Sequence, residues 1–156
     1  MCERQGVTEA LTLREATAED LPAVLALYAQ PGLDDGHVLS SDQAREVFIQ
    51  FARYPSYRLF VACAVDGGVL GSYALLVMHN LAHCGTPSAI VEDVVVDQAC
   101  RGQGIGRQMM AHARAMARAA GCYKLALSSN QRRERAHAFY DSLGFQRHGI
   151  SFVITP

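Results

Sequence analysis

The sequence predicts an α/β domain with a mixed, largely antiparallel sheet and helices on both faces. Short runs rich in β-branched residues alternate with longer amphipathic segments, in the order β-α-α-β-β-β-α-β-α-β-β. A tight turn sequence joins two of the predicted strands directly, which favours antiparallel pairing. A glycine-rich stretch separates the most apolar predicted strand from the longest predicted helix.

The chain begins with a predicted strand and two predicted helices. Residues 11–16 alternate apolar and polar side chains, as in a half-buried strand. Thr17 is a favourable N-cap for the first helix, which extends to about residue 30, and Asp20 stands where a capping box places an acid. A second helix is predicted over 42–53. We expect it to turn three apolar side chains inward: Val47, Phe48 and Phe51.

The middle of the chain is predicted to form a hairpin followed by a strand–loop–helix segment. Strands over 57–65 and 69–79 are joined by the turn sequence at 66–68, and Gly71 marks a bulge or a close approach. A buried strand within 89–96 leads through glycines into a helix that ends near Gly121. We expect one face of this helix to be buried: Ile105, Met109, Ala113, Met116 and Ala120.

The remaining elements are a strand over 123–128, a helix over 134–143 and two final strands over 145–148 and 150–155. Residues 1–10 are predicted to form an N-terminal tail, and residues 11–156 a single domain. No apolar run is long enough to span a membrane, and the first ten residues lack the apolar core of a signal peptide. We therefore expect a cytoplasmic protein.

Composition excludes several classes of function. A net charge near −1 gives no general reason to expect nucleic-acid or membrane binding. The five cysteines are widely spaced without a C-x-x-C pair, which argues against a disulfide framework or a zinc site. The segment from His79 to Cys84 could supply metal ligands, but no acid lies nearby in sequence. We expect a loop that faces substrate or solvent there, and no bound metal.

The glycine-rich loop is suited to binding a phosphate group. The first turn of a helix has unpaired backbone N–H groups and a positive dipole end, and glycine lets an anion approach the backbone closely. The P-loop pattern requires Gly-Lys-Ser/Thr, whereas this loop ends with Ile105-Gly106-Arg107. The dinucleotide pattern would need another glycine spacing and an acid about twenty residues later, and neither is present.

The segment Arg101-x-x-Gly104-x-Gly106 resembles the acetyl-CoA signature of the GNAT acyltransferase superfamily, and the predicted order of elements resembles the GNAT fold. The stretch from Ala136 to Phe145 resembles the second hallmark of that superfamily. The resemblance implies N-acetyl transfer from acetyl-CoA to an amine, and a homodimer. It places the diphosphate on the loop and helix start: Arg101, Gly102, Gln103, Gly104, Ile105, Gly106 and Arg107.

The resemblance also implies catalytic residues. Tyr140 would protonate the leaving thiolate, which is sensible because a phenol can donate to a thiolate in a water-poor site. Glu92 and Asp93 interrupt an apolar strand, and one of them would accept the proton of the attacking amine or bind the ammonium. Strand alternation points the two acids to opposite faces, so we expect only one to face the site, with Glu92 the first choice.

Two closer resemblances disagree about the acceptor. The Glu92-Asp93-Val94 segment is similar to glucosamine-6-phosphate N-acetyltransferases, which implies substrate contacts for both acids and cofactor contacts for Val94, Val95 and Val96. Residues 128–140 are more similar to aminoalkylphosphonate and aminoglycoside-type acetyltransferases. Four other residues are candidates: Asn130 and Phe139 for the cofactor, and His79 and Arg133 for the substrate.

The sequence leaves alternatives open. An acyl-CoA-binding sensor without catalytic activity would use the same fold, and a protein amine could replace a small-molecule amine as the acceptor. Arg133 and its neighbouring arginines could be a solvated turn, and Tyr140 could be a core aromatic residue. We expect catalysis on a small-molecule primary amine such as an amino sugar, an aminoglycoside or an aminophosphonate.

Overall fold

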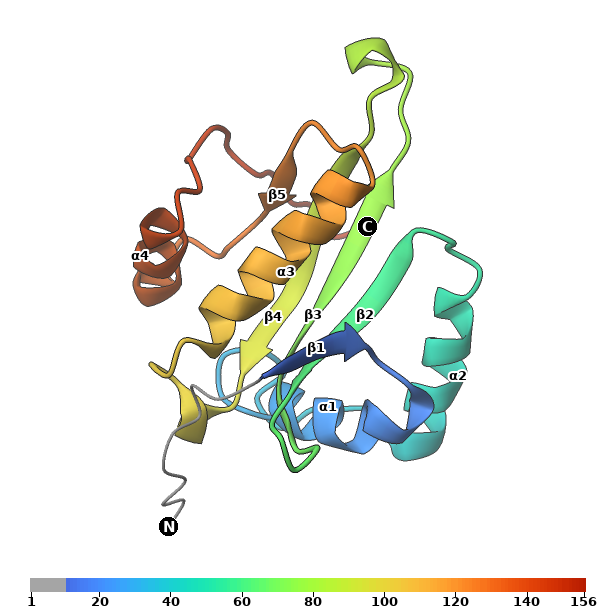
Figure 1. Ribbon diagram of the computed structural model, residues 1–156. Coiled ribbons are helices and arrows are strands. Elements are labelled where there is room, and N and C mark those ends of the chain that lie inside the picture. Colours follow the sequence, from blue (N-terminus) through green and yellow to red (C-terminus); the bar gives the residue numbers. More distant parts are fainter. Residues whose placement is uncertain (1–10) are drawn as a thin grey trace. The chain divides into compact units, whose positions relative to one another are not determined.

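A computed structural model of the protein describes residues 11–156, so the predicted tail over 1–10 lies outside the described residues (Figure 1). The chain forms two compact units, Met1–Ala126 and Leu127–Pro156. The strands are β1 (Thr12–Glu15), β2 (Tyr57–Cys63), β3 (Val69–Met78), β4 (Ser88–Val96) and β5 (Leu125–Leu127). They lie in chain order in one sheet, with antiparallel pairing from β1 to β4, which confirms the predicted sheet.

The helices lie close to their predicted positions. They are α1 (Leu21–Tyr28), α2 (Ser41–Phe51), α3 (Ile105–Ala119) and α4 (Glu134–Ser142). Three short 3-10 turns accompany them: η1 (Ala18–Asp20), η2 (His83–Gly85) and η3 (Gln98–Cys100). Local signals explain most of these boundaries, because Ser40 caps α2 and Gly121 follows the end of α3 with φ 74°.

Helices cover both faces of the sheet in the first unit, as predicted (Figure 1). On one face, side chains of β2 join those of α1 and α2 in an apolar cluster: Leu21, Val24, Ala44, Leu59, Val61 and Cys63. On the other face, Phe60 and Tyr73 pack against His112 of α3. The sheet therefore lies between two helical layers, and its alternating residues decide which layer each side chain meets.

The buried faces of two helices differ from prediction. In α3, Met110 and Ala117 are buried, whereas Met116 is 39% exposed. Ile105, Met109 and Ala113 are buried as expected, and Ala120 lies exposed beyond the last turn. The buried stripe continues in steps of four residues, so it reaches position 117 rather than 116.

In α2, Ala44 is buried while Phe48 and Phe51 pack against the apolar cluster, as predicted for the two aromatic rings. The prediction for Val47 is wrong, since this side chain is exposed. The stripe from Ala44 to Phe48 and Phe51 follows steps of four and three residues, and Val47 falls beside it.

Two irregularities interrupt the central strands, and the first lies in β3. Cys63 pairs with Val69 and Ala62 with Gly71, which leaves one extra residue in β3 beside Gly71. A Cβ on Gly71 would stand 2.7 Å from Met109 Sδ and 3.0 Å from Val95 O. The prediction that Gly71 marks a bulge or a close approach is therefore confirmed in both senses.

The prediction of two final strands is wrong. Residues 145–156 have no regular secondary structure, and several apolar side chains there are exposed: Ile150, Phe152, Val153 and Ile154. Alternation of apolar residues favours a strand, but a strand also needs a neighbouring strand to accept its backbone hydrogen bonds. The segment follows α4 within the second unit, whose described residues supply no such partner.

The cysteines among the described residues differ in burial. Cys63 and Cys100 are buried and Cys122 is half-buried, whereas Cys84 is exposed. Cys2 lies outside the described residues. Over residues 11–156 no helix combines the length and apolarity that a membrane crossing requires. Within the same residues, no group of three or more histidine, cysteine or acidic side chains is placed to hold a metal.

Candidate functional site

The glycine-rich loop enters α3 in a conformation that depends on glycine. Gly102 has φ 78° and Gly104 has φ 82°, both in the left-handed region. A Cβ at either position would meet no atom within 4 Å, so neither glycine is needed to avoid a neighbour in this chain. The backbone of the loop is open on that side, and a ligand can approach it closely.

The N-terminus of α3 has the properties of an anion-binding site. Gly104 is the N-cap residue, so no side chain caps the first turn, and this turn contains no acid. The first intrahelical bond runs from Gln108 N to Gly104 O at 3.1 Å, and the preceding N–H groups have no partner within the helix. Arg101 and Arg107 lie exposed beside these N–H groups. A diphosphate fits both the amides and the charges.

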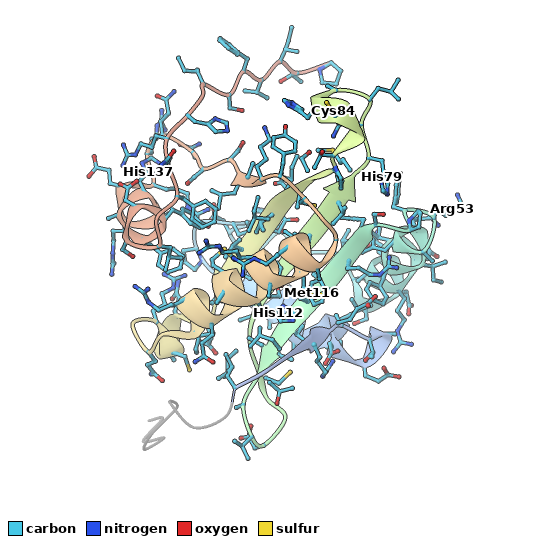
Figure 2. The ribbon with its side chains drawn as sticks, turned by 45° about the horizontal axis from the view of Figure 1, so that its top comes forward. Arg53, His79, Cys84, His112, Met116 and His137 are labelled. Atoms are coloured by element: carbon cyan, nitrogen blue, oxygen red, sulfur yellow. The ribbon has the colours of Figure 1, made fainter. Side chains whose placement is uncertain are left out.

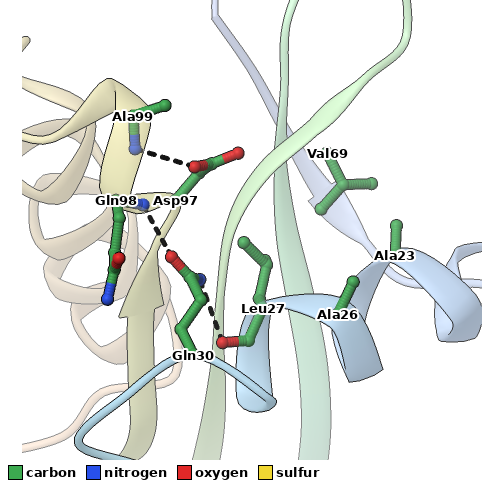
Figure 3. A pocket seen from close by; sticks show the side chains of 8 residues that line it. All are labelled: Ala23, Ala26, Leu27, Gln30, Val69, Asp97, Gln98 and Ala99. Atoms are coloured by element: carbon green, nitrogen blue, oxygen red, sulfur yellow. Dashed lines mark hydrogen bonds between the residues drawn. The ribbon is translucent and has the colours of Figure 1, made fainter.

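Contacts with α1 hold the start of this loop. Gln98 N donates to Gln30 Oε1 at 2.6 Å, and Gln30 Nε2 donates to Leu27 O at 2.9 Å (Figure 3). Asp97 N donates to Leu70 O at 2.8 Å, and Asp97 Oδ1 accepts from Ala99 N at 2.9 Å. These bonds fix η3, and through it the direction in which the loop leaves β4.

A hollow of about 650 Å³ lies at this contact between α1 and η3. Its lining is mostly apolar and contains none of the predicted site residues: Ala23, Ala26, Leu27, Gln30, Val69, Asp97, Gln98 and Ala99 (Figure 3). The hollow therefore does not belong to the site that the sequence predicts.

The two strand acids lie at a β-bulge. Ser72 pairs with Val95 and Ala74 with Glu92, so Asp93 and Val94 together oppose the single residue Tyr73. Asp93 has φ 51°, a left-handed conformation that aspartate tolerates better than most residues. The regular alternation that would send the two carboxylates to opposite faces is broken here.

Register shows which face Glu92 occupies. Directly paired residues of antiparallel strands share a face. Leu59 belongs to the apolar cluster under α1 and α2, Leu59 pairs with Ala74, and Ala74 pairs with Glu92. Glu92 therefore points to the side of α1 and α2. The bulge interrupts the alternation on which the prediction for the two acids was based, so the prediction that only one of them faces the site stays a prediction.

Asp93 and Glu92 belong to a group of side chains that we call the acceptor cluster: Tyr28, Asp34, Tyr57, Glu92 and Asp93. Burial raises the pKa of Asp93, and the charge of Asp34 raises it further. Burial and then the charge of Asp93 raise the pKa of Glu92. Both carboxyl groups are thereby brought nearer to the range of a general base at neutral pH.

Carboxylates of the cluster also raise the pKa values of its two tyrosines, Tyr28 and Tyr57. Burial raises the pKa of Tyr28 to about 12, with further contributions from Asp93 and Asp34. Burial also raises the pKa of Tyr57, and Asp93 and Glu92 add to this effect. The ring of Tyr57 packs against that of Phe51 in a tilted arrangement, with ring centroids 4.7 Å apart. Both phenols are neutral hydrogen-bonding groups beside the carboxylates.

Residues 94–96 form the end of β4, whereas β5 approaches the start of the strand, where Ala89 N donates to Lys124 O at 3.0 Å. Val95 is buried, whereas Val94 and Val96 are half-buried. The bulge interrupts the pairing of Val94 with β3, so the backbone of Val94 lies outside the regular pairing of the two strands. The predicted cofactor contacts of Val94, Val95 and Val96 remain predictions.

His79 lies away from the acids. It is exposed and follows the last residue of β3, at the end where Cys84 also lies (Figure 2). His79 is five positions after Ala74, the partner of Glu92, which corresponds to roughly 16 Å along a strand. His79 therefore does not lie beside Glu92, and its predicted substrate contact remains a prediction.

The second unit carries the other predicted residues. Tyr140 lies on α4, where its ring contacts Phe139 at 5.1 Å and Phe145 at 5.6 Å between centroids. Burial raises the pKa of Tyr140, and the charge of Arg133 opposes this effect. Tyr140 therefore stays protonated at neutral pH and can act as a proton donor.

Asn130 and Arg133 shape the turn before α4. Asn130 Oδ1 accepts from Arg132 N at 2.9 Å, and Asn130 O accepts from Arg133 N at 3.0 Å. His137 Nε2 lies 2.9 Å from Asn130 O, which ties the turn to the helix. Arg133 is the exposed N-cap residue of α4. The predicted ligand contacts of Asn130 and Arg133 remain predictions.

Sequence reasoning missed three members of the acceptor cluster. The sequence analysis gives no functional role to Tyr28, Asp34 or Tyr57. These residues come from α1, the loop after it and β2, so no local motif connects them. The only signal is indirect: a strand with two acids needs polar partners on neighbouring elements.

Comparison with known proteins supports this interpretation of the fold. The model of the acetyltransferase (GNAT) family matches residues 21–145. The chain is 33% identical to the aminoalkylphosphonate N-acetyltransferase of Salmonella typhimurium, over 98% of this chain and 96% of the relative. It is 32% identical to the aminoglycoside N(6')-acetyltransferase type 1 of Stenotrophomonas maltophilia, over 90% and 89%.

Two further comparisons concern glucosamine-6-phosphate N-acetyltransferases and the fold. The glucosamine 6-phosphate N-acetyltransferase of Trypanosoma brucei brucei is 35% identical over 53% of this chain, and the match spans only 54% of that relative. A solved structure from Agrobacterium tumefaciens C58 superposes with a TM-score of 0.84 at 34% identity, over 93% of this chain and 99% of that one. The chain therefore belongs to the acetyltransferase (GNAT) family and is an acyltransferase.

Proposed function

We propose that the protein transfers the acetyl group of acetyl-CoA to a primary amine of a small molecule by direct attack. The observation that carries this proposal is the open N-terminus of α3. Gly102 and Gly104 leave backbone amides free of side chains, and no acid stands in the first turn. This arrangement suits a diphosphate, which coenzyme A contains next to its pantetheine arm.

In the proposed reaction, acetyl-CoA supplies the acetyl group as a thioester. The amine nitrogen bonds to the acetyl carbon and the carbon–sulfur bond breaks. Glu92 or Asp93 takes the proton that the amine loses, directly or through water. Tyr140 gives a proton to the departing thiolate and regains one from solvent. No covalent intermediate with the protein forms.

The pKa directions suit these roles. Burial raises the pKa of both Glu92 and Asp93. The charge of Asp93 raises the pKa of Glu92 further, and the charge of Asp34 raises that of Asp93, so each is a stronger base than an isolated carboxylate. The pKa of Tyr140 is raised by burial, which keeps the phenol protonated until the thiolate forms. A cytoplasmic location and a homodimer remain predictions from the sequence.

The experiment that tests this function is release of free thiol from acetyl-CoA in the presence of a panel of small primary amines. We expect at least one amine to be acetylated, with product detected by mass spectrometry. Coenzyme A binding without turnover of any amine would contradict the proposal and favour the non-catalytic sensor. Acetylation of peptide amines alone would contradict the small-molecule assignment.

A single variant tests the proton donor. Tyr140→Phe should lower kcat by about 10²-fold or more while leaving KM for the amine nearly unchanged, because only the donated proton is lost. Tyr123→Phe is a matched control, since Tyr123 is an exposed tyrosine whose ring packs against His83. Full turnover by Tyr140→Phe would rule out the assignment.

A further inference from the structure

We propose that Gln30 is a positioning residue for the coenzyme. Through one hydrogen bond it holds the turn η3, and it thereby keeps the glycine-rich loop over 101–104 in the conformation that receives the diphosphate. This inference rests on the proposed function, because coenzyme A is taken as the ligand of that loop. It gives the end of α1 a role in coenzyme binding, although α1 and α3 cover opposite faces of the sheet (Figure 1).

The side chain of Gln30 is oriented by the sequence at the end of α1. In a continuing helix, Leu27 O would accept from the backbone N–H of the fourth residue after it, but that residue is Pro31, which has no N–H. Gln30 supplies the donors instead. Its Nε2 donates to Leu27 O at 2.9 Å, and its backbone N donates to the same oxygen at 3.3 Å. The side chain therefore folds back on the last turn of α1, which leaves its Oε1 for another donor.

That other donor is the first amide of η3. Gln98 N donates to Gln30 Oε1 at 2.6 Å, across 68 positions of sequence (Figure 3). Only one orientation of the Gln30 amide suits both partners, because its oxygen must face Gln98 N and its nitrogen must face Leu27 O. The contact is therefore specific for glutamine. An acid at this position would set an oxygen against Leu27 O, and an apolar side chain of the same length would form neither bond.

Gln30 supplies an acceptor that η3 takes from outside the turn. The next two amides of η3 are satisfied locally by Asp97, whose Oδ1 accepts from Ala99 N at 2.9 Å and whose backbone O accepts from Cys100 N at 2.9 Å. Gln98 N stands at the start of the turn, where a helix leaves its first amides without an internal partner. The side chain of Gln30 therefore acts as a second cap of η3, contributed by α1.

Packing contributes less to this contact than the hydrogen bond does. The hollow of about 650 Å³ lies between α1 and η3. Three of the side chains that line it are small: Ala23, Ala26 and Ala99 (Figure 3). On the side of β3, Asp97 N donates to Leu70 O at 2.8 Å. Without the Gln30 bond, η3 would stay attached to β3 but could turn away from α1, because few side-chain contacts oppose this movement.

The orientation of η3 matters because the glycine-rich loop begins directly after it. η3 ends at Cys100, Gly102 has φ 78° and Gly104, the N-cap of α3, has φ 82°. Glycines permit several backbone directions, so the residues of the loop do not fix its course alone. A turn held at its start lowers the cost of ordering the loop amides around an anion, and this raises affinity. Gln30 would thus strengthen diphosphate binding without touching the ligand.

The first test is a substitution that keeps the length of the side chain and removes both of its bonds. We expect Gln30→Met to bind coenzyme A about fivefold more weakly than wild type, the effect of roughly one neutral hydrogen bond. Pantetheine, which has no diphosphate, should bind to both proteins equally. Isothermal titration calorimetry measures the four affinities. Gln50→Met, the same change at an exposed glutamine of α2, should leave all affinities unchanged.

The second test uses the wild-type protein and therefore does not depend on whether the variant folds. Linkage is reciprocal: if the Gln30 bond favours coenzyme binding, coenzyme binding favours the bond. We expect coenzyme A to slow hydrogen exchange of the Gln98 amide about fivefold, measured by NMR, and pantetheine to leave it unchanged. The Ala99 amide, which bonds to Asp97 in the same turn, is the internal reference and should change less.

The outcomes separate two failures. Unchanged coenzyme A affinity in Gln30→Met, an equal loss of affinity for coenzyme A and pantetheine, or Gln98 exchange that coenzyme A does not slow would overturn this inference while leaving the N-acetyltransferase function intact. Absence of coenzyme A binding by the wild-type protein would overturn the proposed function and this inference with it.

Discussion

At the residue scale, Asp20 connects the first strand to the first helix. Its carboxylate accepts bonds from Arg14 Nη1 at 2.7 Å and Arg14 Nη2 at 2.8 Å, and from Thr17 N at 2.8 Å. The hydrogen bonds from Arg14 lower the pKa of Asp20 to about 2. The sequence predicted the capping acid but not the arginine, because Arg14 reaches Asp20 only when the chain turns after β1.

We expect Asp20→Asn to lower the free energy of unfolding by about 1–2 kcal/mol at pH 7, since a charged acceptor is replaced by a neutral one. Arg14 is 41% exposed, which keeps this value below that for a buried pair. The folded pKa is lowered, so the carboxylate stabilises the protein above its unfolded pKa of 3.8, and this contribution disappears as pH falls toward 2.

Urea denaturation of wild type, Asp20→Asn and the control Asp42→Asn measures the effect. The difference between wild type and Asp20→Asn should shrink steadily as the pH is lowered from about 4 to 2. A difference that stays constant over this interval would show that the charge of Asp20 is not responsible.

Glu92 and Asp93 can be distinguished by the pH dependence of kcat/KM. If Glu92 is the base, its raised pKa produces an acid limb, because kcat/KM falls as protonation removes the base. Glu92→Gln should abolish this limb. Asp93→Asn should move it to lower pH, since one source of repulsion is lost. Loss of the limb in Asp93→Asn instead would identify Asp93 as the base.

At the element scale, the close approach of β3 to α3 depends on Gly71. A Cβ there would stand 2.7 Å from Met109 Sδ, and Met109 is fully buried. We expect Gly71→Ala to lower the free energy of unfolding by about 1–3 kcal/mol, because either the methionine or the strand must move. Thermal or urea denaturation measures this. Gly149→Ala, where a Cβ has open space, should have little effect.

Elements with local signals were predictable from the sequence. Repeating apolar positions located α3, the glycines at 67 and 68 located the hairpin, and the glycines at 102 and 104 located the loop before α3. The bulge at Asp93 was not predictable, because it depends on how β4 aligns with β3 rather than on any residue in β4. The two final strands were predicted wrongly because alternation of apolar and polar residues does not specify a neighbouring strand with which to pair.

The candidate site was likewise predictable only where its residues belong to one local segment of the sequence. Arg101 to Arg107 could be identified from one continuous motif, and Glu92 with Asp93 from their unusual place in an apolar strand. The remaining members of the acceptor cluster are far apart in the sequence and meet only through the packing of α1 on the sheet. His79 was chosen for its chemistry, and the length of β3 carries it away from the acids.

At the scale of the whole molecule, the candidate anion-binding and cation-binding groups lie in different parts of the chain. The open first turn of α3 offers amides to an anion, and the α1 side of β4 offers carboxylates to a cation. Both depend on β4, because the strand carries the acids and ends where the turn into the glycine loop begins. The central claim is that the glycine loop binds the diphosphate of coenzyme A.

Isothermal titration calorimetry with coenzyme A and with pantetheine, which has the same thiol arm but no diphosphate, tests this claim most directly. We predict that coenzyme A binds at least about a hundredfold more tightly than pantetheine, and that Gly104→Ala removes most of this difference because its φ of 82° disfavours a side chain. Equal affinity for the two ligands, or no heat of binding with coenzyme A, would contradict the account.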